Sequence, residues 1–308
     1  MAKPRLLNTH SKKWESYKLF LYVLPCLIFI FIFKYLPLWG WSYAFFQYKP
    51  GRDLFKCAFV GLQNFTALFG NAVMRNNLLR VLRNTFGIQI LNYLLMPVPM
   101  LFAIFLSEIK STKFQKAVQT LTTLPHFISW VIMFSLATSL FGNSGVVNAV
   151  LKNFGADGIN ILTTDQHVWL IQSLLALWKS LGWSAIIYFA AITGLDQEVY
   201  EAAMVDGASR WQKIRYITIP LLIPTFFVLL IMGIGNFLNS GIDQFLAFGN
   251  AMNKEYIEVL DLYVYNLGIG NGQISFSVAV GMMKSVVAVV LFALANFASK
   301  KIRGTSVF

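Results

Sequence analysis

The stretch EAAMVDGASRWQKIRYITIP, residues 201–220, is a polar segment rich in alanine and glycine that lies between two long apolar stretches. A loop that only reverses the chain at a membrane surface needs a handful of residues, whereas this segment is much longer and has a helical pattern. Ala202, Ala203 and Ala208 are small, so the surface of another protein can approach them closely. Pro220 is expected to end one helix and to begin the next apolar stretch. The segment therefore predicts a docking element for another protein, with an ordinary amphipathic surface loop as the alternative.

The composition of the chain is typical of a membrane protein. Of its 308 residues, 57% are hydrophobic and 12% are charged, whereas about 25% of the residues are charged in a typical soluble domain. Apolar stretches of about 20 residues, long enough to cross a bilayer as a helix, recur along the chain. Backbone polar groups in lipid must be satisfied within each segment, and the short alternating segments of a membrane β-barrel are not found. The sequence therefore predicts an all-α transmembrane fold.

Six apolar stretches are interpreted as membrane-spanning helices. Pro97 and Pro99 should kink the second of them. Between the first two spans, residues 60–83 are expected to form a helix at the membrane interface. Residues 1–17 are interpreted as a basic tail, and residues 18–308 as one transmembrane domain. The predicted spans cover residues 18–38, 84–106, 117–141, 168–192, 220–240 and 276–298.

The basic residues predict how the chain is oriented. Six spans place both termini on one side of the membrane, together with the segment 201–220 and the short basic connection around Lys113. Because short loops rich in lysine and arginine stay in the cytoplasm, both termini are expected to be cytoplasmic. The long loop after the first span is also basic, but long loops cross with less regard to charge. The net charge of +12 is therefore attributed to contact with anionic lipid, and no nucleic acid partner is expected.

The segment 201–220 resembles a motif of a known family. Glu201-Ala202-Ala203, followed by Gly207, Ile217 and Pro220, resembles the EAA loop of permease subunits in binding-protein-dependent ABC importers, although Ile219 stands where the family usually has leucine. The adjacent pairs Asp206-Gly207 and Trp211-Gln212 resemble the carbohydrate-uptake branch, which includes the larger maltose permease subunit. Two further stretches are similar to permeases for larger or acidic oligosaccharides, such as the alginate importers. These stretches are TLPHFISW (residues 123–130) and LWKSLGW (residues 177–183).

The resemblance implies a type I ABC importer permease (MetI-like) fold and a transport subunit of the cytoplasmic membrane of a bacterium, not an enzyme. Residues 195–219 would form a coupling loop that docks into a groove of a separate ATPase. In the family, the position of Glu201 meets a basic residue of that groove, and Gly207 allows the turn between two short helices. A carboxylate at the start of a short helix is also favoured by the helix dipole. The residues assigned to ATPase coupling are Glu201, Ala202, Ala203, Asp206, Gly207, Ala208 and Pro220.

The implied partners are a second, similar permease, two ATPase subunits, an extracytoplasmic solute-binding protein and the oligosaccharide substrate. The sequence contains no G-x-x-x-x-G-K-[ST] phosphate loop, so ATP and Mg would be bound by the partner ATPase. No cofactor or metal is expected in this chain, because His126 has no second ligand at a suitable spacing. The alternative from another class is an ion-coupled secondary transporter or channel, for which Asp243 is the nearest acidic candidate.

Two lysines lie near the middle of predicted spans, Lys179 in the fourth and Lys284 in the sixth. A charge at this depth is costly, about 2.5–3.5 kcal/mol on insertion scales, and neither lysine has an evident acidic partner within the spans. The functional interpretation is that they line the sugar path and favour anionic sugars such as uronates. The structural interpretation is that they bind backbone carbonyls at kinks or lie at the seam with a second permease.

Two helical faces indicate a substrate path. Lys179 and Trp183 are four residues apart and should share one face, and Gly233, Asn236 and Ser240 should share another. An aromatic plate with amide and hydroxyl groups is suited to sugars, although core packing is the usual role of any single aromatic residue. The resemblance to the maltose permease implies sugar contacts at Lys179, Trp183, Gly233, Asn236, Phe237 and Ser240. Lys284 is added to the predicted substrate path because it is a charged residue within a span.

Overall fold

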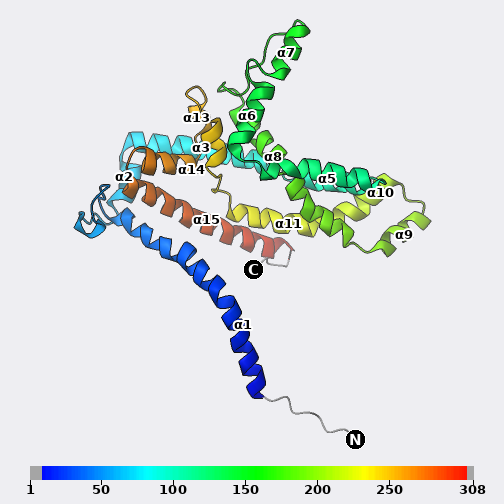
Figure 1. The fold of residues 1–308 in the computed structure, drawn as a ribbon, viewed down its shortest axis with the longest axis horizontal. Helices are drawn as coiled ribbons and strands as arrows, with labels where there is room; N and C mark the ends of the chain where they lie inside the picture. The colour runs from blue at the N-terminus through cyan, green and yellow to red at the C-terminus, as the bar shows by residue number, and fades with distance from the viewer. Residues whose placement is uncertain (1–8, 304–308) are drawn as a thin grey trace.

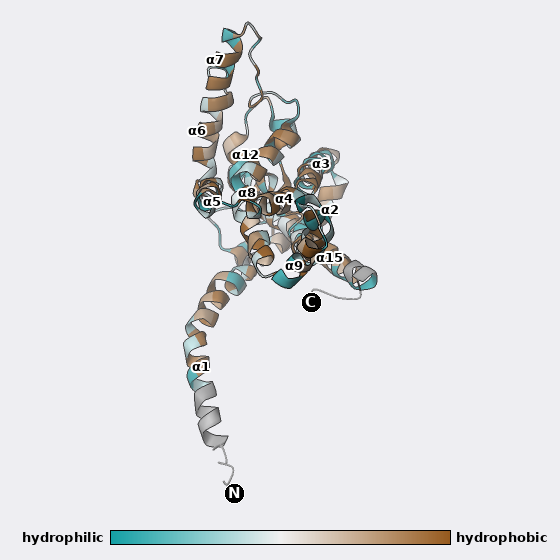
Figure 2. Cartoon of the chain, turned by 90° about the vertical axis from the view of Figure 1, so that its right-hand side faces the viewer, coloured by the Kyte–Doolittle hydropathy of each residue, from teal (hydrophilic) through white to brown (hydrophobic). Residues whose placement is uncertain are grey.

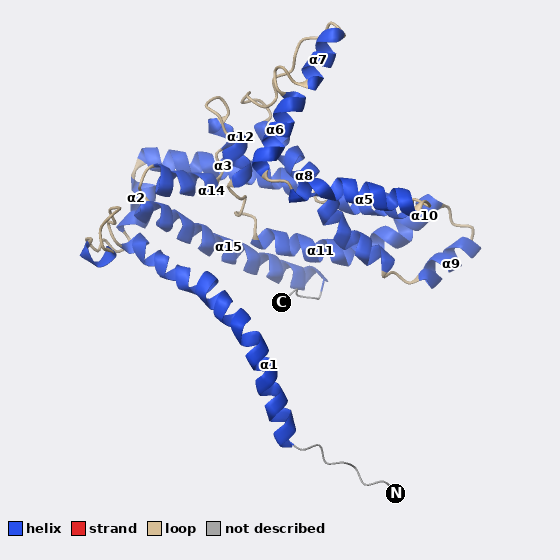
Figure 3. Ribbon diagram, viewed as in Figure 1, coloured by secondary structure: helices blue, strands red, loops and turns tan. Residues whose placement is uncertain are grey.

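The computed structural model describes residues 9–303, and these residues form helices joined by loops (Figures 1 and 3). Strand pairing within that range is limited to one isolated antiparallel bridge, between Phe46 and Phe59. The elements are α1 (Thr9–Ile30), η1 (Phe31–Tyr35), η2 (Leu36–Phe45), η3 (Leu54–Lys56), α2 (Gln63–Gly70), α3 (Ala72–Leu94), α4 (Pro97–Ser107), α5 (Thr112–Phe127), α6 (Trp130–Phe141), α7 (Val146–Asn153), α8 (Val168–Thr193), α9 (Gln197–Val205), α10 (Arg210–Lys213), η4 (Ile214–Thr218), α11 (Ile219–Gly235), α12 (Asp243–Phe248), α13 (Lys254–Ile257), α14 (Leu260–Tyr265), η5 (Asn266–Gly270) and α15 (Ile274–Arg303).

Six helical stretches of the described chain are long and apolar enough to cross a membrane, which confirms the predicted fold class. Residues 1–8 of the predicted basic tail lie outside the described residues, and α1 begins at Thr9, within the range predicted to be tail. The candidate spans are Tyr17–Phe45, Ala72–Ser107, Trp130–Asn153, Val168–Thr193, Arg210–Gly235 and Ile274–Phe297.

The helix of the second candidate span begins at Ala72, so the residues predicted to form one interfacial helix, 60–83, are divided between α2 and the first half of α3. The side chain of Asn71 accepts hydrogen bonds from the backbone N–H groups of Val73 (2.9 Å) and Met74 (3.4 Å), and such a cap starts a helix. Only the short helix α2 remains separate from the span. The predicted kink is present, because α3 ends at Leu94 and α4 begins with proline in its first turn, where the missing N–H costs nothing.

The third predicted span, residues 117–141, is not one helix. The chain is extended at Ile128 and Ser129, and the Ser129 hydroxyl accepts the N–H of Ile132 and starts the new helix α6. α5 runs alongside α8, whereas α6 and α7 extend in a different direction (Figures 1 and 2), and α6 packs against α12. The candidate span is therefore Trp130–Asn153, and the more polar α5 is not among the candidates.

The fifth span differs from the prediction at both ends. It begins at Arg210 and is helical through Pro220 up to Gly235, so Pro220 does not separate two helices. The turn before the proline, η4, is π-helical, and its widened spacing absorbs the missing N–H. Helix α11 ends at Gly235, so the predicted helical face of Gly233, Asn236 and Ser240 does not continue beyond it.

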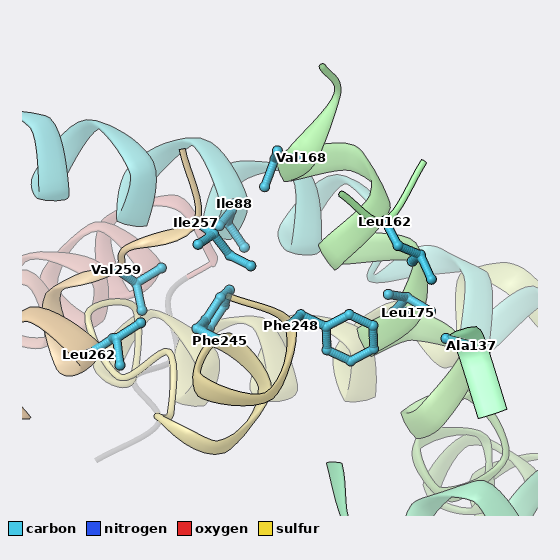
Figure 4. Close-up of a cluster of buried hydrophobic side chains, with 10 residues drawn as sticks. All are labelled: Ile88, Ala137, Leu162, Val168, Leu175, Phe245, Phe248, Ile257, Val259 and Leu262. Atoms are coloured by element: carbon cyan, nitrogen blue, oxygen red, sulfur yellow. The ribbon is translucent and has the colours of Figure 1, made fainter. Parts of the chain in front are cut away.

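α8 lies at the centre of the molecule, where it packs against α3, α4 and α5. One buried cluster forms where α8 meets the loop segments after α11, with Phe245 and Phe248 of α12 between Val168 of α8 and Val259 (Figure 4). A second cluster joins α2 and α3 to α14 and α15 around Tyr263. A third cluster joins α4, α8 and α11. These contacts fix α3, α8, α11 and α15 relative to one another.

α1 stands apart from these helices (Figure 2). None of the residues in the most apolar stretch of its span is buried in the chain. A single soluble protein does not expose so much apolar surface, so this helix must be covered by lipid or by another membrane protein.

Candidate functional site

The segment 201–220 forms two short helices joined by a turn at Gly207. In α9, the Asp196 carboxylate caps the helix by accepting the N–H of Glu198 at 2.9 Å. Gly207 has a φ of +76°, in the left-handed region that favours glycine. The N–H of Ala208 then bonds to the carbonyl of Ala203 at 2.9 Å, which closes the helix end. The turn between two short helices that the resemblance implied is therefore present, and the glycine at position 207 allows it.

α9 and α10 present an exposed surface of mixed character. Glu201, Ala202 and Asp206 are exposed, and the apolar side chains of Val205 and Trp211 are 88% and 60% exposed. Glu201 is the fifth residue of α9, so the prediction that it benefits from a helix start is wrong; Asp196 and Glu198 occupy that position. Apolar groups exposed among polar ones are typical of a surface that docks to a partner.

One hydrogen bond ties this surface to the membrane-spanning helix. The hydroxyl groups of Tyr200, in α9, and Thr218, in η4, lie 2.9 Å apart. Thr218 is only 4% exposed, so the bond links α9 to the buried side of the start of the fifth span. Sequence reasoning missed both residues, because nothing in their spacing shows the contact.

Lys179 binds the end of α5. Its Nζ donates hydrogen bonds to the backbone carbonyls of Pro125 (3.0 Å) and His126 (2.8 Å) and to that of Ile128. The last carbonyls of a helix have no partner within the helix, and a cation is favoured there by the helix dipole. This is the structural interpretation of Lys179: in the described conformation, its three donors are used by backbone at the break between α5 and α6.

Trp183 lies one turn from Lys179 on α8 and supports the same break. Its ring stacks on the imidazole of His126, with centroids 4.4 Å apart and the planes 2° from parallel. Phe127 meets the same ring edge-on at 5.8 Å. His126 lies in the last turn of α5. Lys179 and Trp183 share a face, and that face holds α5 in place.

A cavity of about 470 Å³ lies between α3, α4, α8 and α11. Trp183 forms part of its wall, so one predicted path residue faces both the cavity and the α5 end. Hydroxyl and amide groups from Ser180, Ser184 and Asn92 provide hydrogen-bonding groups in an otherwise apolar lining. An aromatic wall with a few polar groups is suited to a sugar ring. The lining residues are Asn92, Leu95, Met96, Pro99, Ala176, Leu177, Ser180, Trp183, Ser184, Ile187, Tyr188 and Leu229.

The second predicted face lies beside α3. Gly233 leaves room for Tyr93, whose ring atoms would come within 3.1 Å of a side chain at that position. Tyr93 in turn stacks on Phe237 with ring centroids 5.5 Å apart. Asn236 is exposed and faces a separate hollow beside Phe292 of α15. The structure therefore groups Gly233 with Phe237 and places Asn236 elsewhere.

A chain of amides connects the cavity to Ser240. Asn92, in the cavity wall, donates to the side-chain oxygen of Gln89 at 3.4 Å, and Gln89 donates to the Ser240 hydroxyl at 3.1 Å. Both amides lie within the second span, so their polarity in an apolar stretch was a signal that the sequence analysis did not use. α3 is thus the element that joins the two predicted faces.

Lys284 has an acidic partner outside the spans, which the prediction did not consider. Its Nζ contacts the Oδ1 atom of Asp261, in α14. The two side chains are 14% and 16% exposed. Asp261 lies outside the spans in sequence, which is why a search within them missed it.

Two basic residues that follow the first span make contacts within the chain. Arg80 forms an ion pair with Glu258 at 2.5 Å, and the Arg83 guanidinium lies over the rings of Trp169 and Tyr256. Close by, burial raises the pKa of the Tyr263 phenol, the charge of Glu258 raises it further, and Arg80 opposes them. These arginines hold α3 against Glu258 and against Tyr256 of α13, so two of the basic side chains have partners within the chain.

The chain matches known proteins over most of its length. The sequence model of a family described as "Binding-protein-dependent transport system inner membrane component" matches residues 88–304. The chain is 40% identical to the polygalacturonan/rhamnogalacturonan transport system permease protein YteP of Bacillus subtilis (strain 168), over 92% of this chain and 88% of YteP. It is 28% identical to the arabinooligosaccharides transport system permease protein AraP of the same organism, over 92% of this chain and 87% of AraP.

Solved structures give the same result. The chain resembles a chain of a bacterial ABC transporter involved in the import of the acidic polysaccharide alginate, with a TM-score of 0.83, 33% identity and coverage of 96% of this chain and 99% of that one. It also resembles a chain of a bacterial alginate ABC transporter in complex with an alginate pentasaccharide-bound periplasmic protein. There the TM-score is 0.84 and the identity 34%, over 99% of this chain and 100% of that one.

Proposed function

The chain belongs to the family of binding-protein-dependent transport system inner membrane components, and on that premise we propose that it imports oligosaccharides, including those that contain uronic acids. It is a multi-pass permease subunit of an ABC importer, located in the bacterial cytoplasmic membrane. The observation that carries the sugar assignment is the 40% identity to a polygalacturonan/rhamnogalacturonan permease along nearly the whole chain.

The geometry supports a sugar substrate. The cavity between α3 and α8 combines the indole of Trp183 with hydroxyl and amide groups, the combination by which a sugar ring is stacked and hydrogen-bonded. Lys179 and Lys284 are occupied by backbone carbonyls and by Asp261. The preference for uronic acids is therefore proposed from the relatives, and not from these two charges.

The proposed assembly contains a second permease, two ATPase subunits that bind ATP and Mg, and an extracytoplasmic solute-binding protein. The resemblance to the alginate transporter in complex with a periplasmic protein supports the last of these partners. The exposed surface of α9 and α10, tied to the fifth span through Tyr200, supports docking of the ATPase. The family match supports this function over the ion-coupled alternative, for which Asp243 was the candidate.

Reconstitution of the complete complex in proteoliposomes tests the proposal. We expect ATP-dependent accumulation of labelled trigalacturonate, with weaker uptake of the neutral trisaccharide maltotriose. Glu201→Lys should abolish uptake and sugar-stimulated ATPase activity without reducing the amount of the chain in the membrane, because it reverses the charge at the docking surface. Uptake that follows a proton or sodium gradient without ATP would refute the proposal.

A further inference from the structure

Asp261 lies where three elements meet. Its Oδ2 atom accepts the backbone N–H groups of Ser240 (2.8 Å) and Gly241 (3.1 Å), and its Oδ1 atom contacts the Nζ of Lys284. The first two residues follow the end of α11, the aspartate is in α14 and the lysine is in α15. A single carboxylate therefore connects the chain after the fifth span to the sixth span.

The turn at Ser240 needs an acceptor. α11 ends at Gly235, and the chain continues outside any helix through Gly241, which has a φ of +76°. The N–H groups of residues 240 and 241 therefore have no helical partner, and that of the partly buried Ser240 would be costly to leave without an acceptor. Both donate to the Asp261 carboxylate, so this side chain determines where the peptide of Ser240 lies.

Ser240 is also the far end of the amide chain from the cavity. Its hydroxyl accepts a hydrogen bond from Gln89, which accepts one from Asn92 in the cavity wall. The Ser240 peptide is therefore linked to this chain through its side chain, and it lies three residues after Phe237. Phe237 stacks on Tyr93, so the aromatic layer beside Gly233 depends on the same anchor.

Lys284 has a different task from Asp261. A carboxylate that is mostly buried needs a cation nearby, and the Lys284 Nζ is the cation that contacts Oδ1. The charge of Lys284 is therefore bound by Asp261 of the same chain. The lysine pairs with Oδ1 of the Asp261 carboxylate, and Oδ2 of the same carboxylate performs the positioning.

We propose that Asp261 is a positioning residue of the substrate path, which holds the Ser240 turn in place, and that Lys284 is its counter-ion and not a sugar ligand. This inference rests on the proposed function, because it assigns a role within the same path. Under this inference, a substitution at position 261 changes the effect of a substitution at position 284. Asparagine at position 261 keeps an oxygen that accepts the two N–H groups but carries no charge, so it no longer needs the lysine.

The experiment compares four variants of the chain in the complete reconstituted complex. They are Lys284→Met, Asp261→Asn with Lys284→Met, Asp261→Ala with Lys284→Met, and the control Lys300→Met, which changes an exposed lysine of the same helix. Initial rates of ATP-dependent uptake are measured against concentration for trigalacturonate and maltotriose. Thermal unfolding of each complex in detergent gives a second measurement that does not depend on transport.

Lys284→Met should lower the uptake rate about tenfold, because it leaves the carboxylate buried without a cation. The double variant Asp261→Asn with Lys284→Met (the Asn/Met pair) should have an uptake rate within about threefold of wild type, because the two N–H groups keep their acceptor. The double variant Asp261→Ala with Lys284→Met is called the Ala/Met pair. The Ala/Met pair should have a half-saturating sugar concentration about fivefold above that of the Asn/Met pair, since only the acceptor differs. The ratio of trigalacturonate to maltotriose uptake should be unchanged in the Asn/Met pair.

A specific loss of trigalacturonate uptake in the Asn/Met pair would overturn the inference, because Lys284 would then be a sugar ligand. Equal behaviour of the Asn/Met and Ala/Met pairs would also overturn it. If the wild-type complex imports neither sugar, the proposed function fails on its own. The unfolding temperatures then decide this inference: Asn/Met should unfold above Lys284→Met and above Ala/Met, and any other order contradicts it.

Discussion

At the scale of single residues, the two lysines within the spans are used in different ways. Lys179 donates to three backbone carbonyls at the end of α5, whereas Lys284 pairs with a carboxylate. In both arrangements, groups of the same chain bind the lysine ammonium in a region of low dielectric constant. The charge of a buried lysine is therefore not sufficient reason to assign an anionic substrate to it.

Lys179→Met should destabilise the protein by about 2 kcal/mol, because the carbonyls at the break after α5 lose a charged donor. Thermal unfolding of the purified complex should show a fall of about 5 °C. Lys152→Met, which changes an exposed lysine of α7, is the matched control and should have no effect. An unchanged unfolding temperature combined with lost uptake of uronic sugars would instead show that Lys179 binds the substrate.

At the scale of elements, the close approach of α5 and α8 depends on one glycine. A side chain at Gly182 would overlap the backbone of Thr122 and Thr123. Small residues allow membrane helices to pack closely, because the hydrophobic effect does not drive them together in lipid. The contact also positions Trp183, the next residue, against His126.

Gly182→Ala should therefore destabilise the chain by about 2 kcal/mol through overpacking. Gly281→Ala is a suitable control, since no atom lies within 4 Å of a side chain built at that glycine of α15. We expect the control to unfold at the wild-type temperature or slightly above it. Equal unfolding temperatures for the two alanine variants would show that α5 and α8 can separate without cost.

The spans could be predicted from the sequence because apolar stretches of sufficient length have few alternatives in a membrane. Their boundaries depended on weaker local signals. The helix predicted over residues 60–83 is divided between α2 and the start of α3, where Arg80 and Arg83 contact neighbouring elements. The pairing of Lys284 with Asp261 joins residues far apart in sequence, and no spacing rule reveals such a contact.

At the scale of the whole molecule, the orientation in the membrane determines whether the segment 201–220 can reach an ATPase. In a Cys26→Ala background, Cys57 in the first long loop should react with a membrane-impermeant maleimide added outside the cell. With both native cysteines replaced by alanine, Asp206→Cys should react only after the membrane is made permeable, because Asp206 is exposed on the segment that we propose to be cytoplasmic. The variant without cysteine is the control. Labelling of Asp206→Cys in intact cells would exclude ATPase docking at this segment.

The uninterrupted helical rod from Arg210 to Gly235 has a mechanical consequence. Its 26 residues correspond to a rod of about 39 Å at the usual rise per residue. One end adjoins the exposed surface of α9, and the other lies five residues before Ser240, which donates to Asp261. If an ATPase docks at the first end as we propose, a small tilt there would become a larger sideways displacement at the second. The π-helical turn at Ile214–Thr218, close to the first end, is where we would expect such a tilt to be centred.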